Sequence, residues 1–397
     1  MAIISVIGGG QLARMMVPPA SELGVSLKVL VESAQSSAAQ VVVDAPVGAA
    51  TDRDAVRTLV AGADVLTFEH EHVPHDLLRE LIDSGVSVHP GPHALAFAQD
   101  KILMRDRLSS SGFPCPAWVR IPCDDSAHSV ISSFLAAHGP EVIAKTARGG
   151  YDGKGVRVID TSTDLDDWLV AAQEGGPELL LEEKVLFTRE LSALVARNPS
   201  GQVAAWPIVE SIQRDGVCSE VIAPAPGLTD TQHAEIQQLA IRVAEELDVT
   251  GVLAVELFDV VDPSTGQPRI VINELAMRPH NSGHWTITGA VTSQFEQHLR
   301  AVADLPLGDT SPIAPWTVMA NVLGSQLPTL TDALPEVLRA FPQAKVNIYG
   351  KEVRPGRKLG HVTMSGHDLD DVLAHAREAA ALLRGEDISP PHTKDNS

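Results

Sequence analysis

The chain has 397 residues, more than one hydrophobic core usually serves, so two or three domains are expected. Apolar residues make up 44% and charged residues 20%, which excludes a disordered or fibrous chain. The 30 Lys and Arg against 51 Asp and Glu give a net charge of −21, which repels nucleic acid and anionic membranes. We therefore expect no nucleic acid and no membrane as partner, and anionic substrates would need clustered cations or bound metal.

The cysteines and the chain start favour a cytoplasmic protein. Cys115, Cys123 and Cys218 form no C-x-x-C pair, and so sparse a count fits a reducing compartment. The first residues lack the basic region of a signal peptide, and no apolar run of about 18 residues follows.

The first part of the chain alternates β-branched runs with helical stretches, a rhythm typical of a parallel α/β sheet. We predict strands at 3–7, 27–31, 41–43, 65–68 and 86–89, and helices at 11–16, 52–60 and 76–84. Residues 1–98 are therefore expected to form a Rossmann-like domain, which ends near the Pro90-Gly91-Pro92 turn.

A second domain is expected over 99–300 and a third over 301–385. The second begins with a helix at 100–110 and has a strand ending at Lys145, an apolar run at 179–181, and a hairpin of 252–258 with 270–274. A Pro-rich linker at 305–315 precedes a third segment, which contains the runs 345–349 and 351–358 and an amphipathic helix at 368–384, and residues 386–397 are expected to be disordered.

The pattern Gly8-x-Gly10-x-x-Ala13 follows the first strand, and Glu32 ends the second. This satisfies the dinucleotide fingerprint. The glycines themselves require less, because they let backbone amides approach any anion at a helix N-terminus. A dinucleotide site, another phosphate site and a tight structural turn all remain open.

The run Glu69-His70-Glu71-His72-x-x-His75 has the residue types of a metal site. The alternative is a polar strand end at the surface. Glu69 is a candidate substrate contact in either case, because ligands bind at the carboxyl ends of strands in open α/β sheets.

A glycine-rich loop follows Lys145, with four glycines between Gly149 and Gly155 around Tyr151, Asp152 and Lys154. Its amides can fold over a polyphosphate, with Lys145 behind as a fixed charge. A Walker A loop would need Ser or Thr after the lysine, but Gly155 follows Lys154. The loop therefore predicts a phosphate-covering hairpin.

Glu256 and Glu274 lie at equal distances from the middle of the 262–267 turn, so an ideal hairpin places them opposite each other. Carboxylates opposed at about 5 Å destabilise a sheet unless a cation lies between them. Mg²⁺ suits this pair because it leaves coordination positions to substrate phosphates. Asn273 adds a neutral oxygen if the strand bulges.

Two polar segments follow. Residues 278–286, which begin Arg278-Pro279-His280-Asn281, are too polar and turn-prone for a core, and their donors suit a phosphate-bearing substrate. The run Lys351-x-x-Arg354-x-x-Arg357-Lys358 concentrates positive charge in an acidic chain. It is either a solvated hairpin or the cationic patch that anionic substrates need.

Together these segments resemble the ATP-grasp enzymes, and in detail the N5-carboxyaminoimidazole ribonucleotide synthases of purine synthesis. The resemblance covers nearly the whole chain. Its motifs are Gly8-Gly9-Gly10-Gln11-Leu12, Thr67-Phe68-Glu69-x-Glu71-x-Val73, Gly150-Tyr151-Asp152-Gly153-Lys154-Gly155, Asn273-Glu274, His280-Asn281-Ser282-Gly283-His284-Trp285 and Tyr349-Gly350-Lys351-x-x-Arg354-Pro355-Gly356-Arg357-Lys358-x-Gly360-His361.

The resemblance implies an α/β (α+β overall) chain, with an ATP-grasp fold between a Rossmann-like domain and a small C-terminal α+β domain. It implies a cytoplasmic homodimer that uses ATP and bicarbonate to carboxylate 5-aminoimidazole ribonucleotide through carboxyphosphate, releasing ADP and phosphate. Two Mg²⁺ ions are implied, and Mn²⁺ would substitute for them.

The implied site residues fall into four groups. The ATP site is Lys101, Lys145, Gly150, Tyr151, Asp152, Gly153, Lys154, Gly155, Val156, Glu182, Glu183, Lys184, Val185, Glu190, Gln213, Asn273 and Glu274. The ribonucleotide site is Gln11, Leu12, Glu69, His280, Asn281, Lys351, Arg354, Arg357 and Lys358. The metal ligands are Glu256 and Glu274, and the catalytic residues are Tyr151, Asp152, Arg278 and Lys351, with Asp152 orienting the amine or accepting its proton.

The sequence departs from the family pattern at two places. Met277 stands where similar sequences tend to have proline, and Gln213 or Arg214 where a histidine is expected. Three other functions are weighed: a formate-using or glycinamide ribonucleotide ligase of the same superfamily, an NAD-dependent oxidoreductase, and a regulatory module that binds ATP without turnover.

Overall fold

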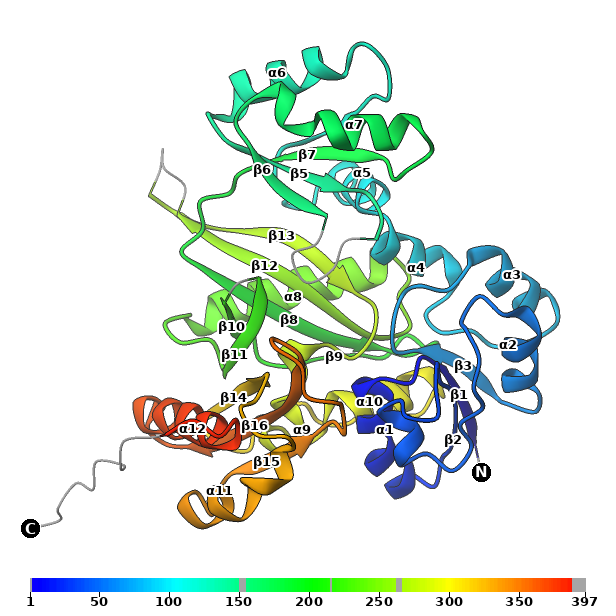
Figure 1. Ribbon diagram of the computed structural model, residues 1–397, viewed down its shortest axis with the longest axis vertical. Coiled ribbons are helices and arrows are strands. Elements are labelled where there is room, and N and C mark those ends of the chain that lie inside the picture. The colour runs from blue at the N-terminus through cyan, green and yellow to red at the C-terminus, as the bar shows by residue number, and fades with distance from the viewer. Residues whose placement is uncertain (1, 150–154, 215, 262–265, 388–397) are drawn as a thin grey trace, which may run out of the picture.

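The computed structural model describes residues 2–149, 155–214, 216–261 and 266–387. Its first part is a small parallel sheet in the order β2-β1-β3, formed by β1 (Ile3–Ile7), β2 (Ser26–Leu30) and β3 (Val65–Phe68). Helices α1 (Gln11–Glu22), α2 (Arg53–Val60) and α3 (His75–Asp83) pack around it (Figure 1). The Rossmann-like prediction for this part is confirmed in strand direction and order of elements.

Two predicted strands of this part are wrong. Residues 41–43 form no strand, and the sheet gains only single bridges at Asp44 and Val47, because the Val43 side chain is fully exposed and has no core to face. Residues 86–89 contribute one bridge, from Val88 to Leu66. The next residue, Pro90, has no N–H to extend a ladder.

Helix α1 runs six residues past its predicted end at Met16, through Pro18 and Pro19, to Glu22. Proline is unfavourable inside a helix, but burial can override propensity. Here Met15, Met16, Pro19 and Ala20 are buried. A further helix, α4 (Pro92–Gln99), links this part to α5 (Lys101–Ser110), whose N-terminus is capped by the Asp100 carboxylate.

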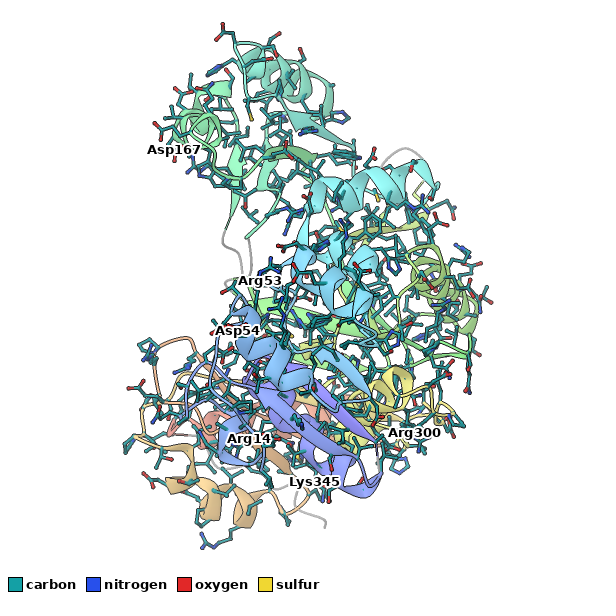
Figure 2. The ribbon with its side chains drawn as sticks, turned by 90° about the vertical axis from the view of Figure 1, so that its right-hand side faces the viewer. Arg14, Arg53, Asp54, Asp167, Arg300 and Lys345 are labelled. Carbon is teal, nitrogen blue, oxygen red and sulfur yellow. The ribbon has the colours of Figure 1, made fainter. Side chains whose placement is uncertain are left out.

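The next part is a separate lobe built on an antiparallel four-stranded sheet, which projects from the body of the molecule (Figures 1 and 2). Its strand order is β4-β7-β5-β6, and α6 (Ala127–His138) and α7 (Asp166–Gln173) pack on it through a shared apolar cluster. The strands are β4 (Trp118–Ile121), β5 (Val142–Thr146), β6 (Val156–Ile159) and β7 (Leu179–Glu183).

The body of the molecule is a nine-stranded sheet whose main path runs β13-β12-β8-β10-β11-β14-β16-β15, with β9 paired to β8. Its strands are β8 (Arg189–Arg197), β9 (Val203–Ala205), β10 (Val209–Arg214), β11 (Val217–Ala223), β12 (Gly251–Val261), β13 (Pro268–Ala276), β14 (Trp316–Leu323), β15 (Lys345–Ile348) and β16 (Lys358–Gly366).

Helices cover this sheet at both ends. One core cluster combines α8 (Asp230–Glu246) with β8 and β12, and another combines α11 (Leu334–Ala340) and α12 (Leu369–Leu383) with β14 and β16. The short α9 (Thr286–Gly289) and then α10 (Gln294–Val302) follow β13, and α10 packs against α1 (Figure 1).

Strands β14 to β16 continue the same sheet as β8 to β13. The proposed domain limit near residue 300 is therefore no break in the sheet and stays a prediction. The predicted disorder at 386–397 falls mostly outside the described residues. Within the described ranges, no helix is both long enough and apolar enough to cross a membrane.

Candidate active site

The β12–β13 hairpin brings Glu256 and Glu274 directly opposite each other, as the sequence predicts. The pairing shifts after Glu256, because Leu257 faces Ile272 and leaves Asn273 as an extra residue. At this bulge the Asn273 side chain faces a lysine: its Oδ1 lies 3.4 Å from Lys145 Nζ.

Both opposed carboxylates have cationic or donor partners. Glu274 Oε1 lies 3.2 Å from Lys101 Nζ, and Glu256 Oε1 lies 3.0 Å from Nε2 of His280. Burial raises the pKa of Glu256, but the hydrogen bond and charge of His280, with the charges of Arg278 and Lys358, hold it below its usual value. Glu256 is therefore ionised in this arrangement.

A third carboxylate, Glu190, lies close by on β8, the strand that pairs with β12. Its pKa is raised to about 7 by burial first, and then by the negative charges of Glu256 and Glu274, against a hydrogen bond from Gln213. Three acidic groups thus crowd one region, which favours a cation there. Among the described residues, no three His, Cys, Asp or Glu side chains form a metal cluster by themselves.

Lys145 is held by a buried ion network that the sequence did not reveal. Glu182 accepts from Lys145 Nζ at 2.8 Å and from Arg105 Nε at 2.6 Å. Burial raises the pKa of Glu182, but the charges of Lys145 and Arg105 outweigh it and lower the pKa to about 2. Arg105 is fully buried and also donates to the carbonyls of Ile272 and Asn273.

The only sequence signal for Arg105 is its place three residues from Ile102 and Leu108, on the apolar face of α5. Its side chain ties that helix to β7 and to the bulge in β13. It therefore supports Lys145 and Asn273 together.

The glycine-rich loop is bounded by an antiparallel pair, as the predicted hairpin requires. Lys145 on β5 faces Val156 on β6, and Gly155 has a φ of 70°, a backbone conformation that favours glycine. Gly150, Tyr151, Asp152, Gly153 and Lys154 lie outside the described residues.

The connection from β7 to β8 carries the next predicted ATP contacts. Glu183 exchanges hydrogen bonds with the backbone N–H and C=O of Ala117, and Lys184 pairs with Glu141. Val185 is half-buried, and two residues later Phe187 stacks on Phe258 with ring centroids 4.6 Å apart. The segment thus offers backbone groups beside an aromatic surface.

The N-terminal glycine turn and the C-terminal cationic segment meet. The Lys351 ammonium contacts Oε1 of Gln11, and Ser37 and Gln40 donate hydrogen bonds to the carbonyls of Tyr349 and Gly350. The predicted convergence of these distant segments is therefore seen. The Leu12 side chain, by contrast, is buried in the core with Tyr349.

Glu69 closes the N-terminus of α1. Its carboxylate accepts hydrogen bonds from the backbone N–H groups of Gly10 and Ala13, the latter at 3.0 Å. Burial raises its pKa, and these hydrogen bonds oppose the rise. An internal carboxylate thus occupies the position where a dinucleotide phosphate would bind, which weighs against the oxidoreductase alternative.

Two further members of the predicted metal motif also have protein partners. Glu71 pairs with Arg278 at 2.9 Å, and Nδ1 of His70 accepts from the backbone N–H of His72. His75 is the first residue of α3, and its buried Nε2 has no hydrogen-bond partner among the described residues. These contacts describe a polar strand end that faces the 278–281 segment.

The cationic run at 351–358 divides into two kinds of side chain. Arg354 pairs with Glu352 and is 66% exposed, and Arg357 donates to the Glu352 carbonyl at 3.2 Å. The charges of Lys351 and Lys358 lower the pKa of Glu69 and of Glu256 respectively. Asn281 has a buried Nδ2 for which no partner is found among the described residues.

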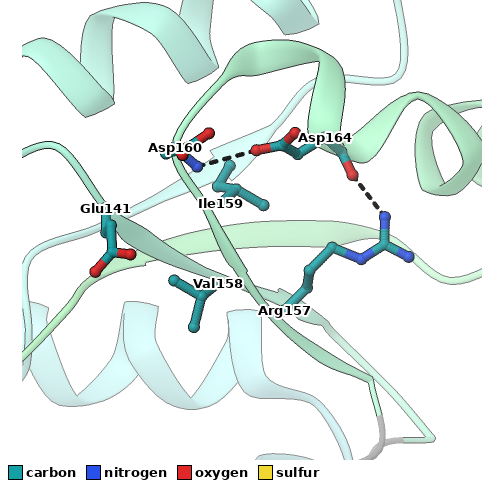
Figure 3. A pocket seen from close by; sticks show the side chains of 6 residues that line it. All are labelled: Glu141, Arg157, Val158, Ile159, Asp160 and Asp164. Carbon is teal, nitrogen blue, oxygen red and sulfur yellow. Dashed lines mark hydrogen bonds between the residues drawn. The ribbon is translucent and has the colours of Figure 1, made fainter.

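A shallow pocket lies elsewhere, at the edge of the four-stranded sheet (Figure 3). Its lining includes Arg157, Asp160 and Asp164. The backbone carbonyl of Asp164 accepts from the guanidinium of Arg157, and its carboxylate accepts from the backbone N–H of Asp160. None of the predicted site residues lines it.

Comparison with known proteins agrees with this geometry. Three families match: the ribonucleotide synthetase preATP-grasp domain over 1–99, the ATP-grasp domain over 106–295, and the phosphoribosylaminoimidazole carboxylase C-terminal domain over 317–375. The fold and site therefore define an ATP-grasp ligase.

The relatives are more specific. The N5-carboxyaminoimidazole ribonucleotide synthase of Mycobacterium tuberculosis is 49% identical, over 98% of this chain and 90% of the relative. The crystal structure of the Thermus thermophilus synthetase is 35% identical, with a TM-score of 0.82 over 98% of this chain and 99% of that one. The Aspergillus clavatus synthase, solved with ADP and 5-aminoimidazole ribonucleotide, is 28% identical, with a TM-score of 0.84 over 96% and 98%.

The chain belongs to the N5-carboxyaminoimidazole ribonucleotide synthases, the ATP-dependent ligases of purine biosynthesis. The fold class, family and enzyme class predicted from the sequence are confirmed. The roles of individual site residues stay predictions.

Proposed function

We propose that the enzyme joins bicarbonate to the exocyclic amine of 5-aminoimidazole ribonucleotide at the expense of ATP. A bicarbonate oxygen attacks the γ-phosphorus and ADP leaves, which gives carboxyphosphate. The amine then attacks the carboxyl carbon, phosphate leaves, and the amine loses a proton. The product is the N5-carboxylated ribonucleotide, and the protein mainly positions and shields the reactants.

One contact carries this proposal: the 3.0 Å bond between Glu256 and His280. Glu256 belongs to the half of the site that contains Glu274 and the two lysines Lys101 and Lys145. These lysines suit a polyphosphate. His280 belongs to the half with Arg278, which pairs with Glu71, two residues after the Glu69 carboxylate that accepts from the glycine turn. The two reactants would therefore meet where this bond joins the halves.

On the ATP side, the proposed contacts are Lys101 and Lys145 to phosphate and the 182–185 connection to adenine, with Glu190 and Gln213 near the ribose. Mg²⁺ fits Glu256 and Glu274, with Asn273 adjacent, because these are oxygen ligands that leave room for phosphate. When bound, Mg²⁺ would offset the charge that develops on the transferred phosphoryl group. Two ions remain our proposal, with Mn²⁺ as a substitute.

On the ribonucleotide side, Lys351, Arg357 and Lys358 are proposed to hold the phosphate and Gln11 and Glu69 the ribose. Arg354 is the weakest member because of its exposed pair with Glu352. Glu69 would exchange at least one of its amide partners for a substrate hydroxyl. Tyr151 and Asp152 keep their proposed place at the amine, outside the described residues.

The location and assembly of the enzyme are also proposed. Cytoplasmic placement is supported by three free cysteines. The homodimer rests on the family resemblance and is tested by sedimentation velocity, where a single monomeric species would reject it.

The order of bond formation is tested with ¹⁸O-labelled bicarbonate. If carboxyphosphate forms, ATP cleavage requires bicarbonate and the released phosphate carries label, since the attacking oxygen leaves with phosphorus. Asp152→Asn should keep part of the bicarbonate-dependent ATP hydrolysis and lose carboxylated product. ATP cleavage that ignores bicarbonate, or unlabelled phosphate, would rule the mechanism out.

A further inference from the structure

A buried glutamine holds the peptide groups of His280. Gln294 is the first residue of α10, and its side chain is fully buried. Its Oε1 accepts from the backbone N–H of His280 at 2.8 Å, and its Nε2 donates to the carbonyl of the same residue at 2.8 Å. One side-chain amide thus satisfies both backbone groups of His280, which fixes that residue in position and orientation.

The same amide also contacts the buried residues beneath the cationic segment at 351–358. Gln294 Nε2 lies 2.9 Å from Nδ1 of His284, which accepts because the amide nitrogen can only donate. The His284 ring stacks on His361 at 5.1 Å, and Nδ1 of His361 bonds the Tyr349 hydroxyl at 2.7 Å. Lys351 follows Tyr349 by two residues. The two segments proposed to bind the ribonucleotide, 278–281 and 351–358, are therefore both supported by the buried side chains of Gln294, His284, His361 and Tyr349.

The residues around the Gln294 amide pack closely against it. A Cβ at Gly283 would lie 2.4 Å from Gln294 Oε1 and 2.3 Å from Leu194 Cδ2, so a side chain there would displace the amide. Thr286 Oγ1 accepts from the backbone N–H of Gln294 and donates to the Gly283 carbonyl. The loop after β13 and the start of α10 are therefore locked together.

We propose that Gln294 is a positioning residue for the ribonucleotide. It acts through His280 and the 278–281 segment, and it does not touch the substrate. The inference rests on the proposed function, which puts the substrate at that segment. Fixing the His280 backbone also fixes its ring, which bonds Glu256 through Nε2 and Ser282 through Nδ1 at 2.9 Å. A small displacement of its backbone would shift both contacts.

The same helix contains a matched control. Gln297, three residues later, is also fully buried and makes the same pair of bonds with Gly308: its Oε1 accepts from the N–H at 2.7 Å and its Nε2 donates to the carbonyl at 2.9 Å. Gly308 lies in the connection to β14 and belongs to no proposed contact. Gln297→Met therefore removes an equivalent amide from the same helix without affecting the site.

The experiment compares Gln294→Met, Gln294→Glu and Gln297→Met in the full enzyme, by steady-state kinetics and thermal unfolding. Gln294→Met should raise the ribonucleotide KM and lower kcat, by about a hundredfold in kcat/KM, with a much smaller rise in the ATP KM. Gln294→Glu keeps the acceptor for the His280 N–H and loses the donor, so it should recover part of that loss. Gln297→Met should lose thermal stability and keep wild-type constants.

Three results would overturn the proposal: wild-type ribonucleotide constants in Gln294→Met, the same loss in Gln297→Met, or equal rises in both KM values. If Gln294→Met does not fold, Gln294→Glu decides, and an unchanged ribonucleotide KM rejects the role. Arg278→Ala separates this inference from the proposed function. If that variant also keeps its ribonucleotide KM, the substrate is elsewhere; if only the Gln294 variants keep it, the positioning role alone fails.

Discussion

The two halves of the site hold positive charge in different ways. In the half proposed for ATP, Lys145 and Lys101 project from β5 and α5 and pair with Glu182 and Glu274, and fully buried Arg105 lies behind them. In the ribonucleotide half, Arg278 and Lys351 come from turns, and Arg354 pairs with Glu352, a neighbour on its own turn.

This difference separates stability from binding. A buried charge that loses its partner destabilises the fold, whereas an exposed cation costs little to remove. Changes behind the ATP half should therefore lower the free energy of unfolding. Changes to the cations of the ribonucleotide half should act mainly on the KM of that substrate.

The opposed carboxylates give the sharpest test of this division, because they are the proposed ligands of Mg²⁺. Glu256→Gln or Glu274→Gln should reduce turnover by about a thousandfold or more. Loss of a single hydrogen-bond donor to a transition state lowers kcat by about a hundredfold to a thousandfold, and loss of a metal ligand should cost at least as much. Stability without ligands should fall only modestly, because Lys101 or His280 loses a partner while the repulsion between the two facing charges is relieved. ADP release and thermal unfolding measure the two effects. Glu235→Gln, an exposed position on α8, is the control, and wild-type turnover in either variant would remove the metal assignment.

Arg105 tests the stability side of the comparison. Arg105→Met leaves Glu182 with one cation and frees two buried carbonyls, so we expect a loss of about 3–5 kcal/mol in the free energy of unfolding. Arg120→Met on β4 removes an exposed ion pair with Glu178, and a loss of about 0–1 kcal/mol in the free energy of unfolding is expected. Urea unfolding of both variants decides, and equal losses would show that burial does not distinguish the two pairs.

The sequence could predict what depends on local pattern. The βαβ start, the hairpin and the opposition of Glu256 and Glu274 were all predictable from periodicity and turn residues. The register was correct partly because of a bulge. Nearer the turn Leu257 faces Ile272, and that pairing carried on without a bulge would set Glu256 opposite Asn273. Only the structure shows the extra residue.

What the sequence could not predict depends on contacts between distant segments. Arg105 meets Glu182 across 77 positions, and no spacing within one element indicates such a pair. Gln294 was missed for the same reason, since its partners lie on a loop before its helix. The false strand at 41–43 shows the converse error, because a run of valines predicts a strand only where a core exists to cover it.

Lys351 tests the binding side. Lys351→Ala should raise the ribonucleotide KM about tenfold to a hundredfold, since a charge-assisted contact contributes about 1.5–3 kcal/mol. The ATP KM and the unfolding free energy should change little. Lys345→Ala, an exposed lysine on β15, is the matched control and should leave both KM values unchanged. An equal rise in the two KM values for Lys351→Ala would place this cation at ATP instead.

A separate expected effect depends on pH and concerns a buried imidazole outside both halves. His298 on α10 accepts from the backbone N–H of Val252 through Nδ1 at 3.1 Å, so its Nε2 carries the proton and donates to Thr67 Oγ1 at 2.8 Å. It thereby links β12 to β3. Burial, and then the charge of His89, lowers its pKa to about 3.

Because the folded-state pKa is about 3 and the ordinary value 6.5, the unfolded chain takes up a proton below pH 6.5 that the folded chain refuses. Stability should therefore fall from pH 6.5 toward 3, by about 1.4 kcal/mol per pH unit for this one group. His298→Gln should be less stable than wild type at pH 7.5, with a gap that narrows by that amount per unit below 6.5. Thr67→Val removes the hydrogen bond but keeps the imidazole, so its gap should stay constant with pH. A constant gap for His298→Gln, measured by urea unfolding between pH 7.5 and 5, would show that His298 is not held neutral.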